Sequence, residues 1–329
     1  MVKIYYLDFW AERYGNPVTL EDINNPQKWK EADKIMSREL VSVPNGVGLL
    51  HINELGKYLR LEKAKNADEA DVLITSCFGN EKAKYKDTNK KIIVLGYEKD
   101  VAEMDYHKYS NVLYVTNFHF EKPCCKFTYL PLFYLYRGFN LTKTLFERRK
   151  KPKKEKFCLS IISNNAVTER NEILEKVMDY KKVDNFGNLL KNENDKLIER
   201  TCWYDSRLFE KIKPYKFMIA FENGSIENYH TEKLLNAWLG NSIPIYWGDP
   251  NINKYFNSKA FININELGIE KAIEKIKELD ENEELYNEMF NEPLLTNECK
   301  NISFLNEDKW RKTIKDFMLR PMKKGQLNK

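Results

Sequence analysis

The chain has 329 residues, of which 42% are hydrophobic and 31% charged, and a length prior of about 150 residues per domain suggests two domains. This balance is typical of a globular protein and excludes disordered, collagen-like and most integral membrane classes. The net charge of +5 is concentrated at one end, because residues 311–329 carry seven Lys or Arg and one Asp, so the rest of the chain sums to −1. We therefore do not expect the broad basic face of a nucleic-acid-binding protein.

In the first half, short apolar runs predict strands over residues 3–10, 71–76, 91–96 and 112–117. Residues 52–66 have the pattern of a surface helix. Short β-branched runs separated by polar or helical stretches are typical of a parallel sheet in an α/β layer.

A basic run from Lys143 to Lys156 contains Pro152 and interrupts this alternation. We predict an N-terminal domain over 1–150, a C-terminal domain over 151–310 and a basic tail over 311–329. The basic run is interpreted as a solvated linker, with contact to an anionic surface as the alternative. For the tail, peripheral contact with an anionic membrane and a solvated chain end both stay open.

In the second half, the pattern predicts strands over 157–162, 215–221 and 242–247 and helices over 168–180, 231–239 and 266–279. Ligands of open parallel sheets bind beyond the carboxyl ends of the strands. This rule singles out the loops 163–170, 222–231 and 248–251, and also Tyr97-Glu98 in the first half. Trp238 and Trp247 are expected in the core.

The N-terminus reaches Lys3 and Asp8 too early for a secretory signal, and no apolar run approaches the ~18 residues of a membrane span. We therefore expect a cytoplasmic protein whose six cysteines are free thiols.

Two cations in the second half point to an anionic ligand. Lys233 falls in the first turn of the helix predicted from Thr231, where a cation is unfavourable unless an anion binds there. Arg170 lies early in the preceding predicted helix and can fork onto phosphate oxygens. Taken alone, each position is better explained by an ordinary surface residue. The sequence has no glycine-rich phosphate loop, no Asp-x-Asp pair and no ligand-spaced histidines, which leaves metal-independent neutralisation of a diphosphate by Lys, Arg and helix dipole.

The segments Phe221-Glu-Asn-(5)-Tyr229-His-Thr-Glu-Lys233 and Ile243-Pro-Ile-Tyr-Trp-Gly248 resemble the α-1,3/4-fucosyltransferase signature of glycosyltransferase family 10, in particular its bacterial Lewis-antigen-making members. The likeness is strong over about 157–265 and weaker over 71–98. It implies an α/β fold of the GT-B type, with two Rossmann-like domains facing across a cleft. The acceptor would bind to the first domain and the sugar nucleotide to the second.

The resemblance implies an inverting α-1,3-fucosyltransferase that moves L-fucose from GDP-β-L-fucose to the 3-hydroxyl of GlcNAc, or of Glc, in a β-galactoside-containing oligosaccharide. Such a reaction belongs to protein or lipopolysaccharide glycosylation. No cofactor is expected, with Mg²⁺ or Mn²⁺ at most stimulatory, and no nucleic acid partner. A GT-B transferase using another sugar nucleotide, and a glycan- or nucleotide-binding module without turnover, are the alternatives.

Carried over by position, the resemblance assigns residues to roles. GDP-fucose would be bound by Ser163, Asn164, Arg170, Asn223, Tyr229, Glu232 and Lys233. Glu98 matches the general base, Glu232 is the second catalytic carboxylate, and Asp8 and Glu222 are the competing bases. Trp10 and His119, aromatic residues near strand ends of the first half, are candidates for contact with the acceptor sugar. His230 departs from the small apolar residue usual in the family.

Overall fold

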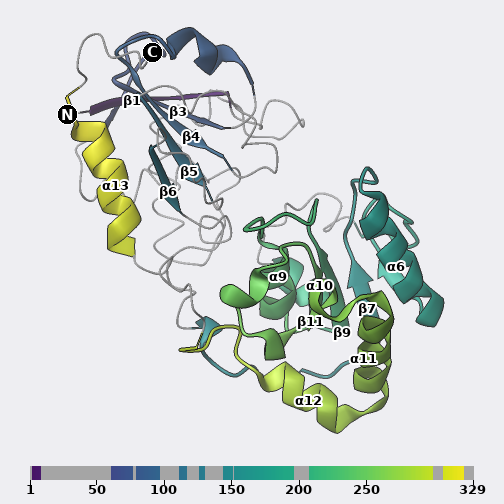
Figure 1. Cartoon of the computed structure of the whole chain (residues 1–329). Coiled ribbons are helices and arrows are strands. Elements are labelled where there is room, and N and C mark those ends of the chain that lie inside the picture. Colours follow the sequence, from purple (N-terminus) through teal and green to yellow (C-terminus); the bar gives the residue numbers. More distant parts are fainter. Residues whose placement is uncertain are drawn as a thin grey trace. The chain divides into compact units, whose positions relative to one another are not determined.

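The structure is a computed structural model, which describes residues 2–8, 61–76, 79–96, 111–116, 126–129, 144–150, 152–195, 207–298 and 307–321. The chain divides into two compact units (Figure 1). The first comprises Met1–Gly138 and Ser303–Lys329, and the second comprises Phe139–Ile302. The sequence-based boundaries at 150 and 310 lie some residues beyond each of these divisions.

The first unit is built on a six-stranded sheet with the order β2-β1-β3-β4-β5-β6, in which every pairing is parallel. Its elements are β1 (Val2–Leu7), β2 (Leu61–Lys63), β3 (Val72–Ser76), the short helix η2 (Glu81–Tyr85), β4 (Lys91–Leu95), β5 (Val112–Thr116) and β6 (Lys126–Tyr129). Strands are found at all four predicted positions. β3 is buried along its whole length, as expected for a central parallel strand.

The predicted helix over 52–66 is wrong for its described part. Leu61–Lys63 form strand β2, which pairs in parallel with β1 at the edge of the sheet. The physical reason is that hydrogen bonding to a neighbouring strand, which local periodicity does not report, outweighs a weak helical pattern.

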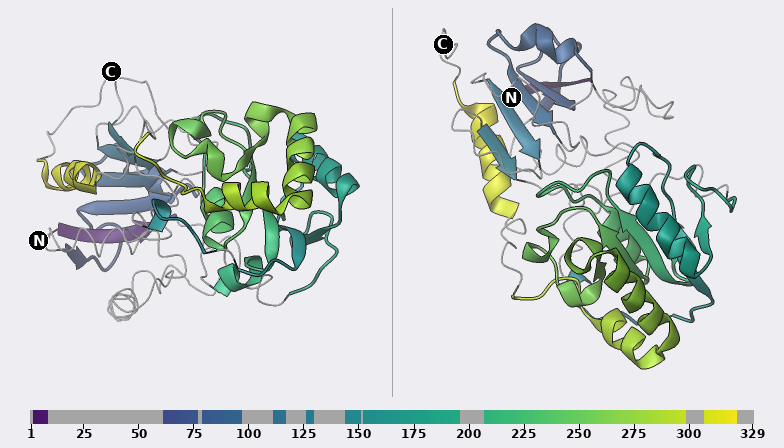
Figure 2. Two further views of the ribbon diagram at one scale, coloured as in Figure 1. Left: turned by 90° about the horizontal axis from the view of Figure 1, so that it is seen from below. Right: turned by 45° about the vertical axis from the view of Figure 1, so that its right-hand side comes forward.

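Helix α13 (Glu307–Leu319) returns to the first unit and lies beside β6 (Figure 2). Its residues Ile314, Phe317 and Met318 are buried, and Lys91 Nζ donates a hydrogen bond to the carbonyl of Met318. Residues 311–319 are therefore not a solvated chain end, and Phe317 and Met318 are not available to enter a membrane. No helix in the described ranges combines the length and apolar character that a membrane span requires.

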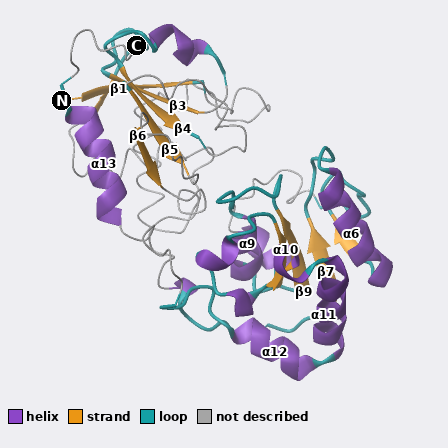
Figure 3. Ribbon diagram, in the orientation of Figure 1, coloured by secondary structure: helices purple, strands orange, loops and turns teal. Residues whose placement is uncertain are grey.

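The second unit contains a five-stranded parallel sheet with the order β11-β10-β9-β7-β8 (Figure 3). Its strands are β7 (Lys156–Ser160), β8 (Val183–Asn185), β9 (Tyr215–Phe221), β10 (Ile243–Trp247) and β11 (Ile262–Asn263). Its helices are α6 (Thr168–Tyr180), α8 (Arg207–Ile212), α9 (Lys233–Leu239), η5 (Ile252–Lys254), η6 (Ser258–Ala260), α10 (Ile264–Leu267), α11 (Ile269–Glu281) and α12 (Glu283–Asn291). The predicted α6 and β9 are confirmed at both ends.

The helix predicted over 266–279 is interrupted at Gly268, which has a φ of 76° and separates α10 from α11. Only glycine adopts this left-handed backbone without steric cost. The apolar periodicity continues across the break, which is why the sequence pattern predicts one helix where the structure has two.

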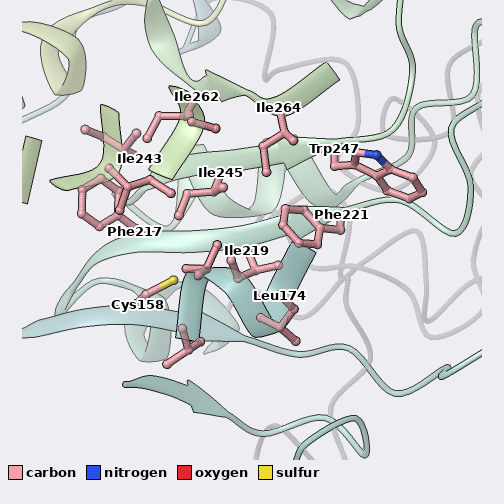
Figure 4. Packing of buried hydrophobic residues seen from close by; sticks show 14 of the residues in the cluster. Cys158, Leu174, Phe217, Ile219, Phe221, Ile243, Ile245, Trp247, Ile262 and Ile264 are labelled. Carbon is pink, nitrogen blue, oxygen red and sulfur yellow. The ribbon is translucent and has the colours of Figure 1, made fainter. Parts of the chain in front are cut away.

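The core of the second unit lies between its sheet and the helices that cover it (Figure 4). Phe221 and Trp247, at the ends of β9 and β10, pack edge to face with ring centroids 6.5 Å apart. Trp238 and Trp247 are both buried, as predicted. Cys158 is a buried free thiol, whereas the other five cysteines lie outside the described residues.

The basic run is not simply a solvated linker, because two of its side chains are anchored in the second unit. Arg149 Nη1 donates to the carbonyls of Trp238 (2.7 Å) and Ser242 (2.9 Å), and Nη2 donates to that of Phe290 (3.0 Å). Its guanidinium also lies 4.5 Å and 4.2 Å from the ring centres of Trp238 and Phe290, within cation–π range. Lys154 Nζ likewise donates to three carbonyls.

Candidate functional site

Three polar loops follow the neighbouring strands β7, β9 and β10 and meet at the carboxyl edge of the second sheet. The Glu222 amide donates to the Trp247 carbonyl (2.8 Å), which joins the loops after β9 and β10. Ser225 Oγ donates to the Gly248 carbonyl (2.9 Å) across the same junction. The loops singled out from the sequence are thus brought together, as strand adjacency in a parallel sheet requires.

Glu222 is the centre of this site and is fully buried, with 0% of its surface exposed. Its Oε1 accepts a hydrogen bond from the Thr231 amide (2.7 Å), and its Oε2 accepts from Thr231 Oγ1 (2.7 Å) and Lys233 Nζ (3.1 Å). A Cβ at position 248 would lie 2.5 Å from Glu222 Cγ, so only glycine fits there. A buried carboxylate with three donors stabilises the loop and is poorly placed to take a proton from a substrate.

Arg170 lies in the first turn of α6 and links the loops after β7 and β9. It is 1% exposed; its Nη1 donates to the Glu222 carbonyl (3.2 Å) and to Asn223 Oδ1 (2.9 Å), and its Nη2 donates to the Asn164 carbonyl. Burial lowers the pKa of Arg170, while the charge of Glu222 opposes that shift. The guanidinium is thus engaged with protein oxygens, although its buried Nε has no hydrogen-bond partner among the described residues.

Lys233 is the first residue of α9, and 28% of its side chain is exposed. Its Nζ lies 2.8 Å from Thr231 Oγ1 and 3.5 Å from Glu232 Oε1, in addition to its bond with Glu222. Burial lowers the pKa of Lys233, but the charges of Glu222 and Glu232 outweigh burial and hold the pKa above its ordinary value. The lysine therefore stays protonated at neutral pH.

Glu232 differs from Glu222 although both carboxylates contact the same lysine. Glu232 is 7% exposed. Among the described residues it forms an ion pair with Lys233, at 3.5 Å. No side-chain capping bond ties Glu232 to α9. Its carboxylate oxygens therefore remain able to accept hydrogen bonds from the hydroxyls of a ligand.

The remaining donor-site candidates lie around this cluster. Tyr229 is buried and close enough to Arg170 to interact with it electrostatically. Asn223 is half-buried and bonded to Arg170. Ser163 and Asn164 are exposed in the loop after β7, where Asn164 Oδ1 accepts a hydrogen bond from the Ala166 amide (2.9 Å). The structure thus brings Arg170, Asn223, Tyr229, Glu232 and Lys233 together, with Asn164 joined through its backbone.

In the first unit, the proposed base Glu98 and the acceptor candidates Trp10 and His119 lie outside the described residues. The competing base Asp8 is described and buried at the end of β1. Its carboxylate accepts from the amides of Glu81 (3.1 Å) and Lys82 (2.7 Å) and from Lys82 Nζ (3.3 Å). Asp8 and Glu222 are therefore both occupied by structural donors, which argues against either as the base.

Sequence reasoning missed one pair of residues at this site. His230 Nδ1 donates to Asp249 Oδ2 (3.0 Å), which joins the loop after β9 to the turn after β10. The signal was present as Asp249 in the Gly-Asp-Pro turn directly after a buried strand. No group of three His, Cys, Asp or Glu side chains suited to a metal ion occurs within the described ranges.

Parallel α/β units with charged loops at the carboxyl edge of a sheet are typical of nucleotide-binding proteins. Residues 151–314, which contain this site, match the C-terminal domain of glycosyltransferase family 10 (fucosyltransferase). The chain belongs to this family.

Two curated relatives show how much of the chain resembles known fucosyltransferases. An α-(1,3)-fucosyltransferase of Helicobacter pylori is 32% identical over 171 residues, which make up 50% of this chain and 34% of that protein. A GDP-fucose protein O-fucosyltransferase 3 of Xenopus tropicalis is 31% identical over 150 residues, 44% of this chain and 32% of that protein. The chain thus spans about a third of the length of these curated relatives.

A crystal structure of an α1,3-fucosyltransferase matches with a TM-score of 0.68 at 20% identity, covering 96% of this chain and 90% of that one. At this identity the likeness concerns the fold alone. It confirms the predicted α/β fold with two Rossmann-like units, the GT-B fold.

Proposed function

We propose that this protein transfers L-fucose from GDP-β-L-fucose to the 3-hydroxyl of GlcNAc, or of Glc, in a β-galactoside-containing glycan, with inversion at the anomeric carbon. Membership of a fucosyltransferase family and the names of its relatives support this activity. We assign the reaction to the cytoplasm and to precursors of surface glycans such as Lewis-type lipopolysaccharide. Any contact of residues 311–329 with a membrane would rest on their basic side chains, because Phe317 and Met318 are buried.

One observation carries the proposal: Lys233 and Glu232 stand side by side at the carboxyl edge of β9. Lys233 is oriented by Glu222 and Thr231 yet keeps part of its side chain exposed. Beside it, Glu232 keeps acceptor capacity for hydroxyls. A fixed cation next to an available carboxylate suits a ligand that combines a diphosphate with a sugar.

The geometry suggests how these groups serve the reaction. As fucose departs from GDP, negative charge grows on the diphosphate, and protonated Lys233 is fixed in advance to stabilise it. Arg170 holds the backbone of Asn164 and the side chain of Asn223 around the same place. Glu232 accepts hydrogen bonds from hydroxyls of the donor, and Glu98 removes the proton of the acceptor hydroxyl. GDP leaves without a proton, so no general acid is needed.

We propose that no metal ion is required, with Mg²⁺ or Mn²⁺ at most stimulatory, because Lys233 already supplies a positive charge. Transfer should then survive EDTA at least in part. Complete loss of transfer that added metal restores would contradict this proposal.

The direct test is a screen of sugar nucleotides that includes GDP-fucose, with β-galactoside disaccharides containing GlcNAc or Glc as acceptors. Fucosylated product linked at the 3-hydroxyl is expected with GDP-fucose. Preference for another sugar nucleotide would favour the alternative transferase. A Glu98→Ala variant that binds GDP but transfers no fucose would exclude a binding module without turnover, and unchanged transfer would remove Glu98 as the base.

The donor site is tested by Lys233→Gln in a titration with GDP. Loss of a charge-assisted contact to phosphate should cost about 1.5–3 kcal/mol of binding free energy, which raises the Kd for GDP roughly 10-fold or more. The matched control is Lys176→Gln, which removes a lysine from an exposed ion pair with Glu270 in the same unit. Equal GDP titration curves for both variants and the unchanged protein would exclude Lys233 from the site.

A protein hydroxyl is the second candidate acceptor, because a relative at 31% identity is named a GDP-fucose protein O-fucosyltransferase. The same screen should therefore carry an arm with folded protein acceptors. Transfer to protein Ser or Thr without transfer to the disaccharides would replace the glycan acceptor while leaving the donor assignment intact.

A further inference from the structure

The loop that carries Tyr229, Glu232 and Lys233 is fastened by a buried polar pair to which the proposed chemistry gives no role. His230 and Asp249 are 1% and 0% exposed, and His230 Nδ1 donates to Asp249 Oδ2 at 3.0 Å. A hydrogen-bond donor and its acceptor that are buried together cost free energy unless their hydrogen bond is kept, so the contact is expected to persist.

Asp249 is held independently of His230. Its Oδ1 accepts from the Asn251 amide (2.8 Å), and its own amide donates to the Tyr246 hydroxyl (2.9 Å). Tyr246 belongs to β10 and is fully buried. The acceptor of the His230 bond is therefore fixed on the rigid end of a central strand, and His230 is the member that docks the loop onto it.

Aromatic contacts hold the same part of the loop. The His230 ring lies 4.6 Å from the ring centre of Tyr255 and 5.9 Å from that of Phe256. Tyr255 also donates from its hydroxyl to Asn228 Oδ1 (2.6 Å), and Asn228 has a left-handed φ of 64°. On the other side of His230, Thr231 is bonded to Glu222, so His230 lies between two anchored points.

We propose that His230 and Asp249 are a pair of positioning residues that fix Tyr229, Glu232 and Lys233 for binding of the donor nucleotide. His230 directly follows Tyr229 and precedes Glu232 by two residues, so freeing it displaces both neighbours. What the loop binds rests on the proposed function, whereas the fastening of the loop does not. Because a group set in place before binding loses less entropy, the pair acts chiefly on donor affinity.

The test separates the hydrogen bond from the ring. His230→Phe keeps an aromatic ring against Tyr255 and Phe256 but removes the donor to Asp249, and His230→Asn keeps an N–H near the position of Nδ1 without the ring. The matched control is Tyr180→Phe, which removes a neutral donor to Asp280 Oδ2 (3.1 Å) at the far end of α6. Two readouts apply to each purified variant: hydrogen exchange of the amides of 226–233, and steady-state kinetics with GDP-fucose.

His230→Phe is expected to speed exchange in residues 226–233 and to raise the KM for GDP-fucose roughly 10-fold while kcat changes little. His230→Asn should recover much of both, and Tyr180→Phe should leave both unchanged. Unchanged exchange and KM in His230→Phe would overturn the proposal. So would a His230→Asn variant as impaired as His230→Phe, because keeping the hydrogen-bond donor to Asp249 would then restore nothing.

If His230→Phe does not fold, Asp249→Asn weakens the same bond with little change of shape, and faster exchange of 226–233 with a higher KM for GDP-fucose is again expected. The hydrogen-exchange measurement also distinguishes failure of the proposed function from failure of the proposed role of His230 and Asp249. If the unchanged protein binds no GDP but His230→Phe still loosens 226–233, the proposed function fails while the fastening of the loop stands.

Discussion

Glu222 and Glu232 show how the surroundings of a residue decide its role. Both are buried glutamates that contact Lys233. Glu222 has three donors and no exposed surface, whereas Glu232 has one long contact and some exposure. The first is part of the framework of the site, and the second is available to a ligand. Substitution of each by Gln should therefore affect different properties of the protein.

Glu222→Gln is expected to lower the free energy of unfolding of the second unit by about 2–4 kcal/mol, because the half-buried Lys233 loses the closer of its two counter-charges and a fully buried hydrogen-bond network is disturbed. The new amide N–H₂ would also face Lys233 Nζ or Thr231 Oγ1, which are donors to this carboxylate. Denaturant titration followed by tryptophan fluorescence measures the change. A loss of less than about 0.5 kcal/mol, the range of neutral surface substitutions, would show that Glu222 is not an anchor.

Glu232→Gln should leave the free energy of unfolding within about 0.5 kcal/mol, since the ion pair that Glu232 forms among the described residues is long. It should instead lower kcat/KM for GDP-fucose by roughly 10- to 100-fold, because an amide accepts hydroxyl hydrogen bonds more weakly than a carboxylate. Steady-state kinetics with the unchanged protein as reference checks this. Large destabilisation with normal kinetics would reverse the roles assigned to the two glutamates.

Some site residues can be predicted from the order of strands along the chain, whereas others are defined by hydrogen bonds that form only when the loops pack. Arg170 and Lys233 were found because each follows a strand of a parallel sheet, and chain order then predicts that they share an edge. The anchoring role of Glu222 was missed because its donors come from Thr231 and Lys233 after the loop folds back. The partnership of His230 and Asp249 likewise depends on the packing of two loops.

At the scale of elements, Asp280 of α11 ties together the end of α6 and strand β9. Lys181 Nζ donates to its Oδ2 (2.8 Å) and Lys216 Nζ to its Oδ1 (2.9 Å), and the side chain is only 5% exposed. Burial raises the pKa of Asp280, but its hydrogen bonds with Lys181 and Lys216 outweigh burial and hold the pKa below its ordinary value. The helices on this side of the sheet therefore depend on an ionised aspartate.

Because its pKa is lower in the folded than in the unfolded state, Asp280 stabilises the fold above the unfolded pKa of about 3.9. That contribution is lost as the pH falls below about 4 through the folded value. Lys216→Met should destabilise the second unit at pH 7, and the difference from the unchanged protein should shrink between about pH 4 and pH 2. Urea titrations over this range test it, and a pH-independent difference would rule out the ion pair as the cause.

A helix or strand can be predicted when its local sequence pattern determines it, but not where contacts with distant residues set its limits. Strand β9 (Tyr215–Phe221) is apolar apart from Lys216, and β10 (Ile243–Trp247) is apolar throughout. Such runs are typical of buried parallel strands, so the sequence predicts both. The break at Gly268 and the start of α9 at Lys233 rather than Thr231 were not predicted. Thr231 is held out of the helix by its two hydrogen bonds to Glu222, a tertiary effect that helix-start signals do not contain.

At the scale of the whole molecule, the first unit is assembled from both ends of the chain. Helix α13 comes from beyond the second unit and places Ile314, Phe317 and Met318 in the interior of the first. Lys312 of this helix is exposed, as is Arg320 directly after it, and Lys315 is half-buried. The stability of the first unit therefore depends on residues that composition alone marks as a basic tail.

Phe317→Ala tests this assembly. Removal of a buried aromatic ring should cost the first unit about 3–5 kcal/mol, whereas the matched surface variant Lys312→Ala should cost less than about 0.5 kcal/mol. Because the proposed donor site lies wholly in the second unit, GDP affinity should be the same in both variants. Calorimetry with and without GDP resolves the two effects, since a ligand raises the unfolding temperature only of the unit that binds it. If Phe317→Ala unfolded with unchanged thermal stability, α13 would not be part of the first unit's core. If it lost GDP binding while remaining folded, the donor site would extend beyond the second unit.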